Sequence, residues 1–148
     1  MRLSKVLISS LASIFLVSCG SITTPPQRSE KVSIMTSFLP ITLFASAVAG
    51  ECGDVNALIP TNIGPHDFQS TPKDVLSIGK ADIFFINGLG METFLDRLIS
   101  SAASTTLSVV DTSVGIKTIS TDISNTDSYS EPNPHIWLDP LRAVSQVE

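Results

Sequence analysis

Two histidines stand out because they are the only ones in the 148-residue chain and each follows a proline. His66 lies in the segment PTNIGPHDFQSTP, and His135 lies in the segment PNPHIWLDP. Neutral imidazole is the commonest ligand for transition metals, and a preceding proline restricts the backbone and reduces the entropy lost on binding. A histidine in a loop is more often only solvated or hydrogen bonded, and two in stiff loops at one edge make a metal site the main alternative.

Acidic and aromatic neighbours of the two histidines each admit two interpretations. Asp67 and Asp139 can either orient an imidazole by accepting its hydrogen bond or cap the helix that follows. For Asp139 we favour the cap, because Pro140 after it suits the first turn of a helix. Trp137 can shield a metal site from water, although a place in the core is the commoner role for such a side chain.

Other chemistries have little support in the sequence. It contains no HExxH, CxxC, GxxxxGK[ST] or G-x-S-x-G motif, and Gly88-Leu89-Gly90 does not complete the dinucleotide-binding fingerprint. The net charge is −5 and no run of Lys or Arg occurs, which argues against nucleic-acid binding. We expect no enzymatic activity. A two-histidine metal hydrolase is the least favoured hypothesis, because neither loop offers an identifiable general base.

Alternating strands and helices are predicted to hold these loops. The patterning predicts strands at 31–37, 54–59, 81–87 and 107–110, and helices at 41–49, 73–78, 92–101 and from 140 onward. The following segment, rich in Ser, Thr and Asp, allows a further short strand at 115–119. The apolar run ADIFFIN is typical of a strand buried on both faces of a parallel sheet.

This order predicts an α/β fold: an open, mostly parallel sheet with helices on both faces. Ligands of such sheets bind beyond the carboxyl ends of the strands. Both histidines lie in loops that follow strands, so we expect them at the same edge of the sheet.

The first 30 residues resemble an export and anchoring segment. Arg2 and Lys5 precede an apolar stretch that ends in Leu-Val-Ser-Cys-Gly, with the cysteine at Cys19. This resembles the lipobox of bacterial lipoproteins, which implies a signal peptide at 1–18, a lipid on Cys19 and a flexible tether at 19–30. The alternatives are a plain signal peptide or an uncleaved anchor. The lipid implies membrane attachment on the extracytoplasmic or periplasmic side.

Cys52 is left without an obvious role if Cys19 is acylated. An odd cysteine in an exported protein indicates either a partner outside this chain or a buried free thiol. We slightly favour the buried thiol.

Four ordered segments resemble the solute-binding lipoproteins of zinc and manganese ABC transporters. They are SFLPITLFASAVAG, ALIPTNIGPHDFQSTPKD, KADIFFINGLGMETFLDRL and NPHIWLDP, and they cover most of residues 31–142. The resemblance implies two α/β lobes joined by a long helix, with one Zn(II) or Mn(II) ion held between them as the transported ligand. The family's first two metal ligands fall on His66 and His135.

The resemblance also implies a domain layout and a partner. Residues 31–138 would form the N-terminal metal-binding lobe, and 139–148 would begin the connecting helix, with the second lobe and its two ligands absent. The metal would pass to an ABC permease in the inner membrane.

Two features qualify this interpretation. Zinc-specific members often carry a His-rich loop before the second ligand motif, whereas residues 116–134 contain no histidine. A site with two protein ligands should also be weak, because closed sites normally have four. A truncated, non-transporting fragment or an interaction module is therefore the alternative function.

Overall fold

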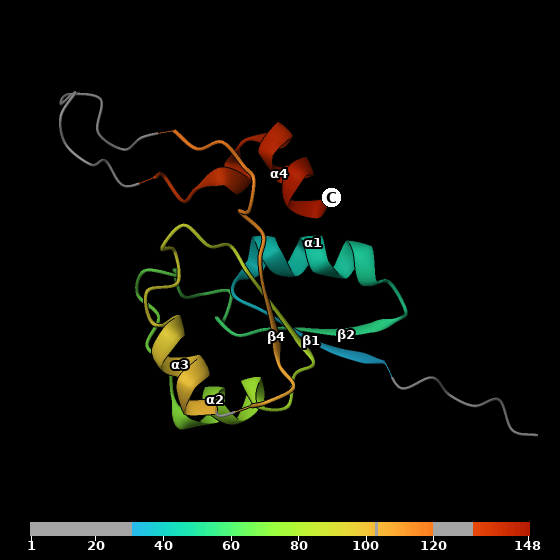
Figure 1. Cartoon of the computed structure of the whole chain (residues 1–148), viewed down its shortest axis with the longest axis vertical. Coiled ribbons are helices and arrows are strands. Elements are labelled where there is room, and N and C mark those ends of the chain that lie inside the picture. The colour runs from blue at the N-terminus through green and yellow to red at the C-terminus, as the bar shows by residue number, and fades with distance from the viewer. Residues whose placement is uncertain (1–30, 103, 120–131) are drawn as a thin grey trace, which may run out of the picture.

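A four-stranded parallel sheet forms the centre of the molecule. The computed structural model describes residues 31–102, 104–119 and 132–148. The strands are β1 (Val32–Thr36), β2 (Gly53–Ala57), β3 (Ile83–Ile86) and β4 (Ser108–Asp111), in the order β2-β1-β3-β4. All neighbouring strands are parallel, so their carboxyl ends meet at one edge (Figure 1). The predicted α/β class is confirmed.

Helices lie on both faces of the sheet. Helices α2 (Pro72–Ile78) and α3 (Leu95–Ala102) lie on one side, and α1 (Leu39–Ala49) lies on the other (Figure 1). Helix α4 (Pro140–Val147) follows a short 3₁₀ helix (Ile136–Leu138) and lies beyond α1. Of the helices that the structure describes, none is long and apolar enough to cross a bilayer.

Two hydrophobic clusters hold these layers together. The first lies between the sheet and the α2–α3 pair around the fully buried Phe84, and its buried members are Met35, Leu58, Ile78, Ala81, Phe84, Leu95 and Leu98. The second consists of residues that follow three strand ends: Phe38, Ile41, Ile59 and Met91. The second cluster therefore supports the edge of the sheet at which ligands are expected.

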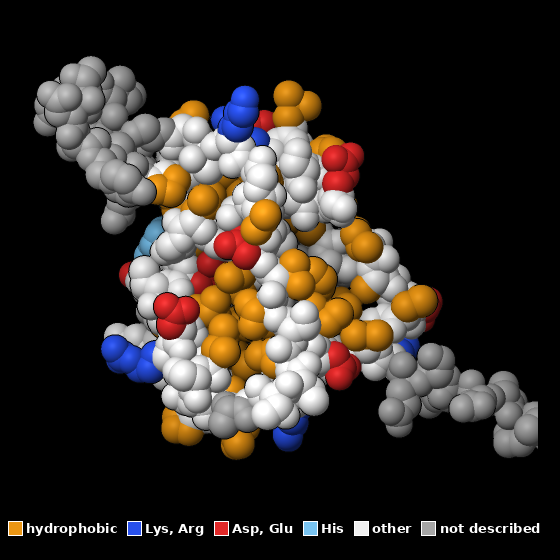
Figure 2. Space-filling view, in the orientation of Figure 1, with side chains coloured by type: hydrophobic (Ala, Val, Ile, Leu, Met, Phe, Trp, Pro, Cys, Tyr) orange, Lys and Arg blue, Asp and Glu red, His pale blue; other side chains and the backbone are white. Residues whose placement is uncertain are grey.

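Apolar side chains remain exposed on the edge strand β4. Val109 and Val110 point to opposite faces of the sheet, and 40% and 37% of their surfaces are accessible. Figure 2 shows hydrophobic side chains gathered over β4 and beside it. Near this patch, an apolar groove of about 230 Å³ runs between the sheet, α1 and the end of α4.

Local sequence explains where helices α2 and α4 begin. At α2 the side chains of Thr71 and Asp74 form a capping box, with Pro72 in the first turn. At α4 the carboxylate of Asp139 accepts hydrogen bonds from the backbone N–H groups of Leu141 and Arg142. The cap interpretation of Asp139 is confirmed. Asp67 is not a cap, because Thr71 caps the helix that follows it.

Three sequence-based expectations require correction. The helix expected from residue 92 begins at Leu95, because the Glu92 side chain binds the preceding loop. The stretch 115–119 is not a strand but continues from a turn, and Ile119 accepts a backbone hydrogen bond from Asn133. Cys52 is exposed rather than buried, because it lies in the tight connection between α1 and β2.

The predicted signal peptide at 1–18, the lipidation site Cys19 and the tether at 19–30 lie outside the described residues. Most of the Ser/Thr/Asp-rich segment also lies outside them.

Candidate metal centre

The fold brings His66 and His135 together. His66 lies in the loop after β2, and His135 immediately precedes the 3₁₀ helix. Their ring centroids are 5.8 Å apart with an interplanar angle of 53°. Both rings line one open pocket of about 520 Å³, together with Leu89, Gly90, Thr93, Pro132 and Pro134. The two histidines therefore share the edge of the sheet that the topology predicts.

The separation of the rings suits joint coordination of one ion. With Zn–N bonds of about 2.0–2.1 Å, two imidazoles on one tetrahedral ion place their ring centroids about 5 Å apart. The observed 5.8 Å exceeds this by less than 1 Å. Both histidines are solvent-exposed, so small rotations of the side chains can close the difference.

Asn133 fixes the orientation of the His135 ring. Its Oδ1 atom accepts the backbone N–H of His135 at 3.0 Å and lies 2.8 Å from Nδ1 of the same residue. Since a backbone N–H can only donate, the amide atom must be the oxygen, and Nδ1 must carry the proton. The other ring nitrogen, Nε2, then has a free lone pair, which is the form that a metal requires.

The backbone next to His135 is held from inside the molecule. The Pro134 carbonyl accepts hydrogen bonds from Asn87 Nδ2 at 2.9 Å and from the Ile136 N–H at 2.8 Å. Asn87 directly follows β3 and is completely buried. The loop that carries His135 is therefore tied to the centre of the sheet.

Trp137 belongs to the core and also lies beside His135. Its ring packs edge-on against Phe38, with centroids 4.8 Å apart, and against the second hydrophobic cluster. The His135 ring lies 5.2 Å from it. The favoured core interpretation agrees with this packing, and the same ring limits how far the imidazole can turn.

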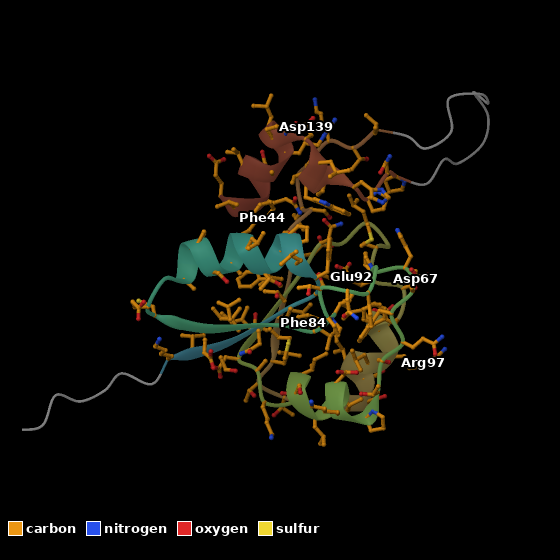
Figure 3. All side chains as sticks on the ribbon, turned by 180° about the vertical axis from the view of Figure 1, so that it is seen from behind. Phe44, Asp67, Phe84, Glu92, Arg97 and Asp139 are labelled. Carbon is orange, nitrogen blue, oxygen red and sulfur yellow. The ribbon has the colours of Figure 1, made fainter. Side chains whose placement is uncertain are left out.

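The His66 loop is anchored mainly by apolar packing. Phe68 packs edge-on against Phe94, with ring centroids 4.9 Å apart, and contacts both hydrophobic clusters. The Asp67 N–H donates to the Gly64 carbonyl within a tight turn. Asp67 lies at the edge of the molecule (Figure 3). Among the described residues no side chain hydrogen bonds to the His66 ring, so the proposed orienting role of Asp67 has no support.

A loop with unusual backbone conformations forms another wall of the pocket. Gly88, Leu89 and Gly90 all have positive φ angles, of 83°, 56° and 76°. A β-carbon on Gly88 would clash with the Asp111 carboxylate, and the positive φ angle disfavours any other residue there. A left-handed leucine is uncommon, so this loop needs support from its surroundings.

Glu92 supplies that support. Its two carboxylate oxygens accept the backbone N–H groups of Asn87 and Gly88 at 2.8 and 3.1 Å. Figure 3 shows Glu92 in the interior. Burial raises the pKa of Glu92 above its ordinary value of 4.5, although these two hydrogen bonds act to lower it. The nearby Ser37 hydroxyl also lowers the pKa, but its Oγ meets no described partner in good hydrogen-bond geometry.

The described residues bring together two candidate metal ligands rather than a closed set. Within 31–102, 104–119 and 132–148, no three His, Cys, Asp or Glu side chains cluster as a metal site. Two neutral imidazoles cancel none of the charge on a divalent cation, and an open pocket leaves the remaining positions to water or other ligands.

Sequence reasoning missed the residues that orient this pair. Asn133 carried a local signal, because an asparagine two residues before a site residue can form a turn through its side chain. Asn87 carried none, because Pro134 is 47 positions away in the chain.

Known proteins with similar sequences and folds bind transition metals. The family model described as zinc-uptake complex component A, periplasmic, matches residues 34–148. The zinc-binding lipoprotein AdcA of Streptococcus pneumoniae serotype 4 is 28% identical, over all of this chain and 30% of its own length. The manganese-binding lipoprotein MntA of Halalkalibacterium halodurans is 30% identical, over 88% of this chain and 41% of its own length.

Among solved structures, the Zn(II)-bound ZnuA-like domain of Streptococcus pneumoniae AdcA is similar with a TM-score of 0.68 and 28% identity. The match covers 79% of this chain and 41% of that one. The chain thus spans less than half the length of these relatives. Because the family model covers most of it, the chain belongs to the zinc-uptake complex component A family, which includes proteins named for zinc binding and zinc uptake.

Proposed function

We propose that this chain captures a divalent transition metal, zinc or manganese, outside the cytoplasmic membrane for delivery to an ABC importer. His66 and His135 donate ring nitrogens to the ion. Further ligands would come from outside the two histidine loops, in the second lobe that the family resemblance implies. The relatives named for zinc and for manganese support this class of ligand.

The pairing of the two imidazoles carries the proposal. Loops far apart in the sequence place them 5.8 Å apart in one pocket, and Asn133 leaves Nε2 of His135 free to bind. Nitrogen-rich ligation favours Zn(II), whereas a remainder rich in carboxylates would permit Mn(II).

Lipid attachment at Cys19 completes the proposal. The acylated cysteine would hold the protein on the extracytoplasmic or periplasmic face, next to the permease. The lipoprotein names of the relatives support this location.

Replacement of each ligand tests the proposal directly. We expect His66→Ala and His135→Ala each to weaken Zn(II) binding by at least about tenfold. Loss of a residue that only hydrogen bonds to a ligand already lowers metal affinity by about that factor, and loss of the ligand itself should cost no less. Titration of the purified chain against a competing chromogenic chelator measures the change. Gln69→Ala, an exposed neighbour in the His66 loop, is the control and should bind as the original chain does. Unchanged affinity in both histidine variants would rule the proposal out.

A non-transporting fragment is the alternative function. The incomplete ligand set among the described residues agrees with it. Intact mass spectrometry of the native protein distinguishes the two. A mass equal to the lipidated chain from Cys19 to Glu148 supports the fragment, whereas a mass near twice that supports metal capture by two lobes.

A further inference from the structure

Asn87 uses its whole side chain to join three segments. Its Nδ2 atom donates to the Gly88 carbonyl at 3.1 Å and to the Pro134 carbonyl at 2.9 Å. Its Oδ1 atom accepts from Gln146 Nε2 at 3.2 Å. The segments joined are the loop after β3, the loop that carries His135, and helix α4. No surface of Asn87 is accessible to solvent.

The contacts with Pro134 and with Gln146 use opposite ends of the Asn87 amide, Nδ2 and Oδ1. The Pro134 carbonyl directly precedes His135, so a shift of this carbonyl moves the ligand. On the other side, Gln146 is a buried residue of α4 and also donates to Thr112 Oγ1 at 2.9 Å. The Oε1 atom of Gln146 is buried without a described partner. The hydrogen bonds that hold the Gln146 side chain in place are therefore the two that Nε2 donates.

Because the buried Asn87 amide bonds to Gln146 at one end and to the Pro134 carbonyl at the other, a movement of one partner changes the position of the other. If α4 moves, Gln146 leaves Asn87 Oδ1 unpaired in the interior, and the least costly response is a rotation of the amide. Rotation of that amide withdraws Nδ2 from the Pro134 carbonyl. The docking of α4 and the placement of His135 are thereby linked through one side chain.

We propose that Asn87 is a positioning residue that couples the docking of helix α4 to the orientation of the His135 imidazole. The proposal rests on the proposed function, because it assigns His135 as a metal ligand. It predicts that metal affinity depends on a residue that never touches the ion.

Two variants and a matched control test the coupling. Asn87→Ala removes all three side-chain contacts, with Gly88, Pro134 and Gln146. Gln146→Leu removes the contacts of α4 with Asn87 and Thr112 but keeps the Asn87 amide, which the proposal expects to bond the Pro134 carbonyl less often. Thr36→Val is the control, because Thr36 is equally buried but bonds to Thr42 and Asn56, away from both histidine loops.

The first readout is Zn(II) affinity, measured by competition with a chelator. We expect Asn87→Ala to lose about tenfold or more, as is usual when a ligand loses its supporting contact. We expect a smaller loss for Gln146→Leu and none for Thr36→Val.

The second readout is the protonation pattern of the imidazole rings, followed by long-range ¹H–¹⁵N correlation spectra without metal. The original chain should show His135 protonated mainly at Nδ1. In Asn87→Ala the His135 nitrogen shifts should move toward a mixture of tautomers, and the His66 shifts should not change. This signature separates positioning from a general loss of stability.

Each result decides a different question. Equal losses in Asn87→Ala and Thr36→Val, or an unchanged His135 spectrum in Asn87→Ala, would overturn the positioning role. A Gln146→Leu chain that matches the original in both readouts would overturn the coupling to α4, and it remains informative if Asn87→Ala does not fold. If His135→Ala itself bound Zn(II) normally, the proposed function would fail first.

Discussion

At His135, a single amide oxygen determines which ring nitrogen faces the pocket. Asn133 Oδ1 contacts both the backbone N–H and Nδ1 of the same residue. A free imidazole exchanges between two tautomers and several ring orientations, so this contact removes states that cannot bind. The restriction is made before the metal arrives, which reduces the entropy lost on binding.

Removal of the Asn133 side chain should therefore weaken binding without unfolding the protein. We expect Asn133→Ala to lower Zn(II) affinity by about tenfold to a hundredfold. The free energy of unfolding should change little, because these hydrogen bonds are exposed to solvent. Chelator competition measures the first quantity and urea denaturation the second.

Asn133→Asp is the matched control, because it keeps an acceptor oxygen at the same position and should retain most of the affinity. An alanine variant that binds as tightly as the original chain would show that the ring needs no such support.

At the scale of elements, the connection between β3 and α3 shows why a helix starts later than its sequence pattern predicts. Glu92 has a helix-forming side chain, yet its carboxylate turns back to bind two N–H groups of the preceding loop. That loop forms part of the pocket wall through Leu89 and Gly90. The glutamate is thus committed to holding the loop rather than extending the helix.

The raised pKa of Glu92 makes this connection sensitive to pH. Because the folded-state pKa lies above the unfolded value, the protonated form is favoured in the fold. The resulting stability is complete below about pH 4.5 and is lost as pH rises through the folded-state pKa. We expect Glu92→Gln to lack this pH-dependent stability. Between about pH 4.5 and the folded-state pKa of Glu92, the free energy of unfolding of the variant should therefore fall less than that of the original chain.

Urea denaturation at a series of pH values measures the effect as the difference between the original chain and Glu92→Gln. A difference that does not change with pH across the window would contradict the assignment. Asp96→Asn in α3 is a suitable control, because it makes the same change from acid to amide at an exposed position.

The element order could be predicted from the sequence, and so could the shared edge of the two histidines. The apolar run that forms β3 and the alternation with helices require a parallel sheet, and a parallel sheet places loops such as those of His66 and His135 together. The contacts of Asn87 could not be predicted. Asn87 bonds to Pro134 and to Gln146, which lie 47 and 59 positions later in the chain. No local sequence pattern marks a buried asparagine with such distant partners.

At the scale of the whole molecule, the two proposed ligands belong to parts of the chain that meet only in the fold. His66 follows β2 and His135 follows β4, so a metal ion bound by both connects opposite ends of the sheet order. The unfolded chain can bind the ion with one histidine at a time, but rarely with both. The folded state therefore has the higher affinity.

This difference predicts that Zn(II) stabilises the protein against unfolding. If the folded chain alone bound the ion, a concentration of about 100 times the Kd would add about 2.7 kcal/mol to the free energy of unfolding. Weak binding to the unfolded chain reduces this figure, so we expect a somewhat smaller gain. Urea denaturation at increasing Zn(II) concentrations measures it, and excess chelator should abolish it. The double variant His66→Ala with His135→Ala should show no gain. An equal gain in that variant would mean that the ion stabilises the fold from another site.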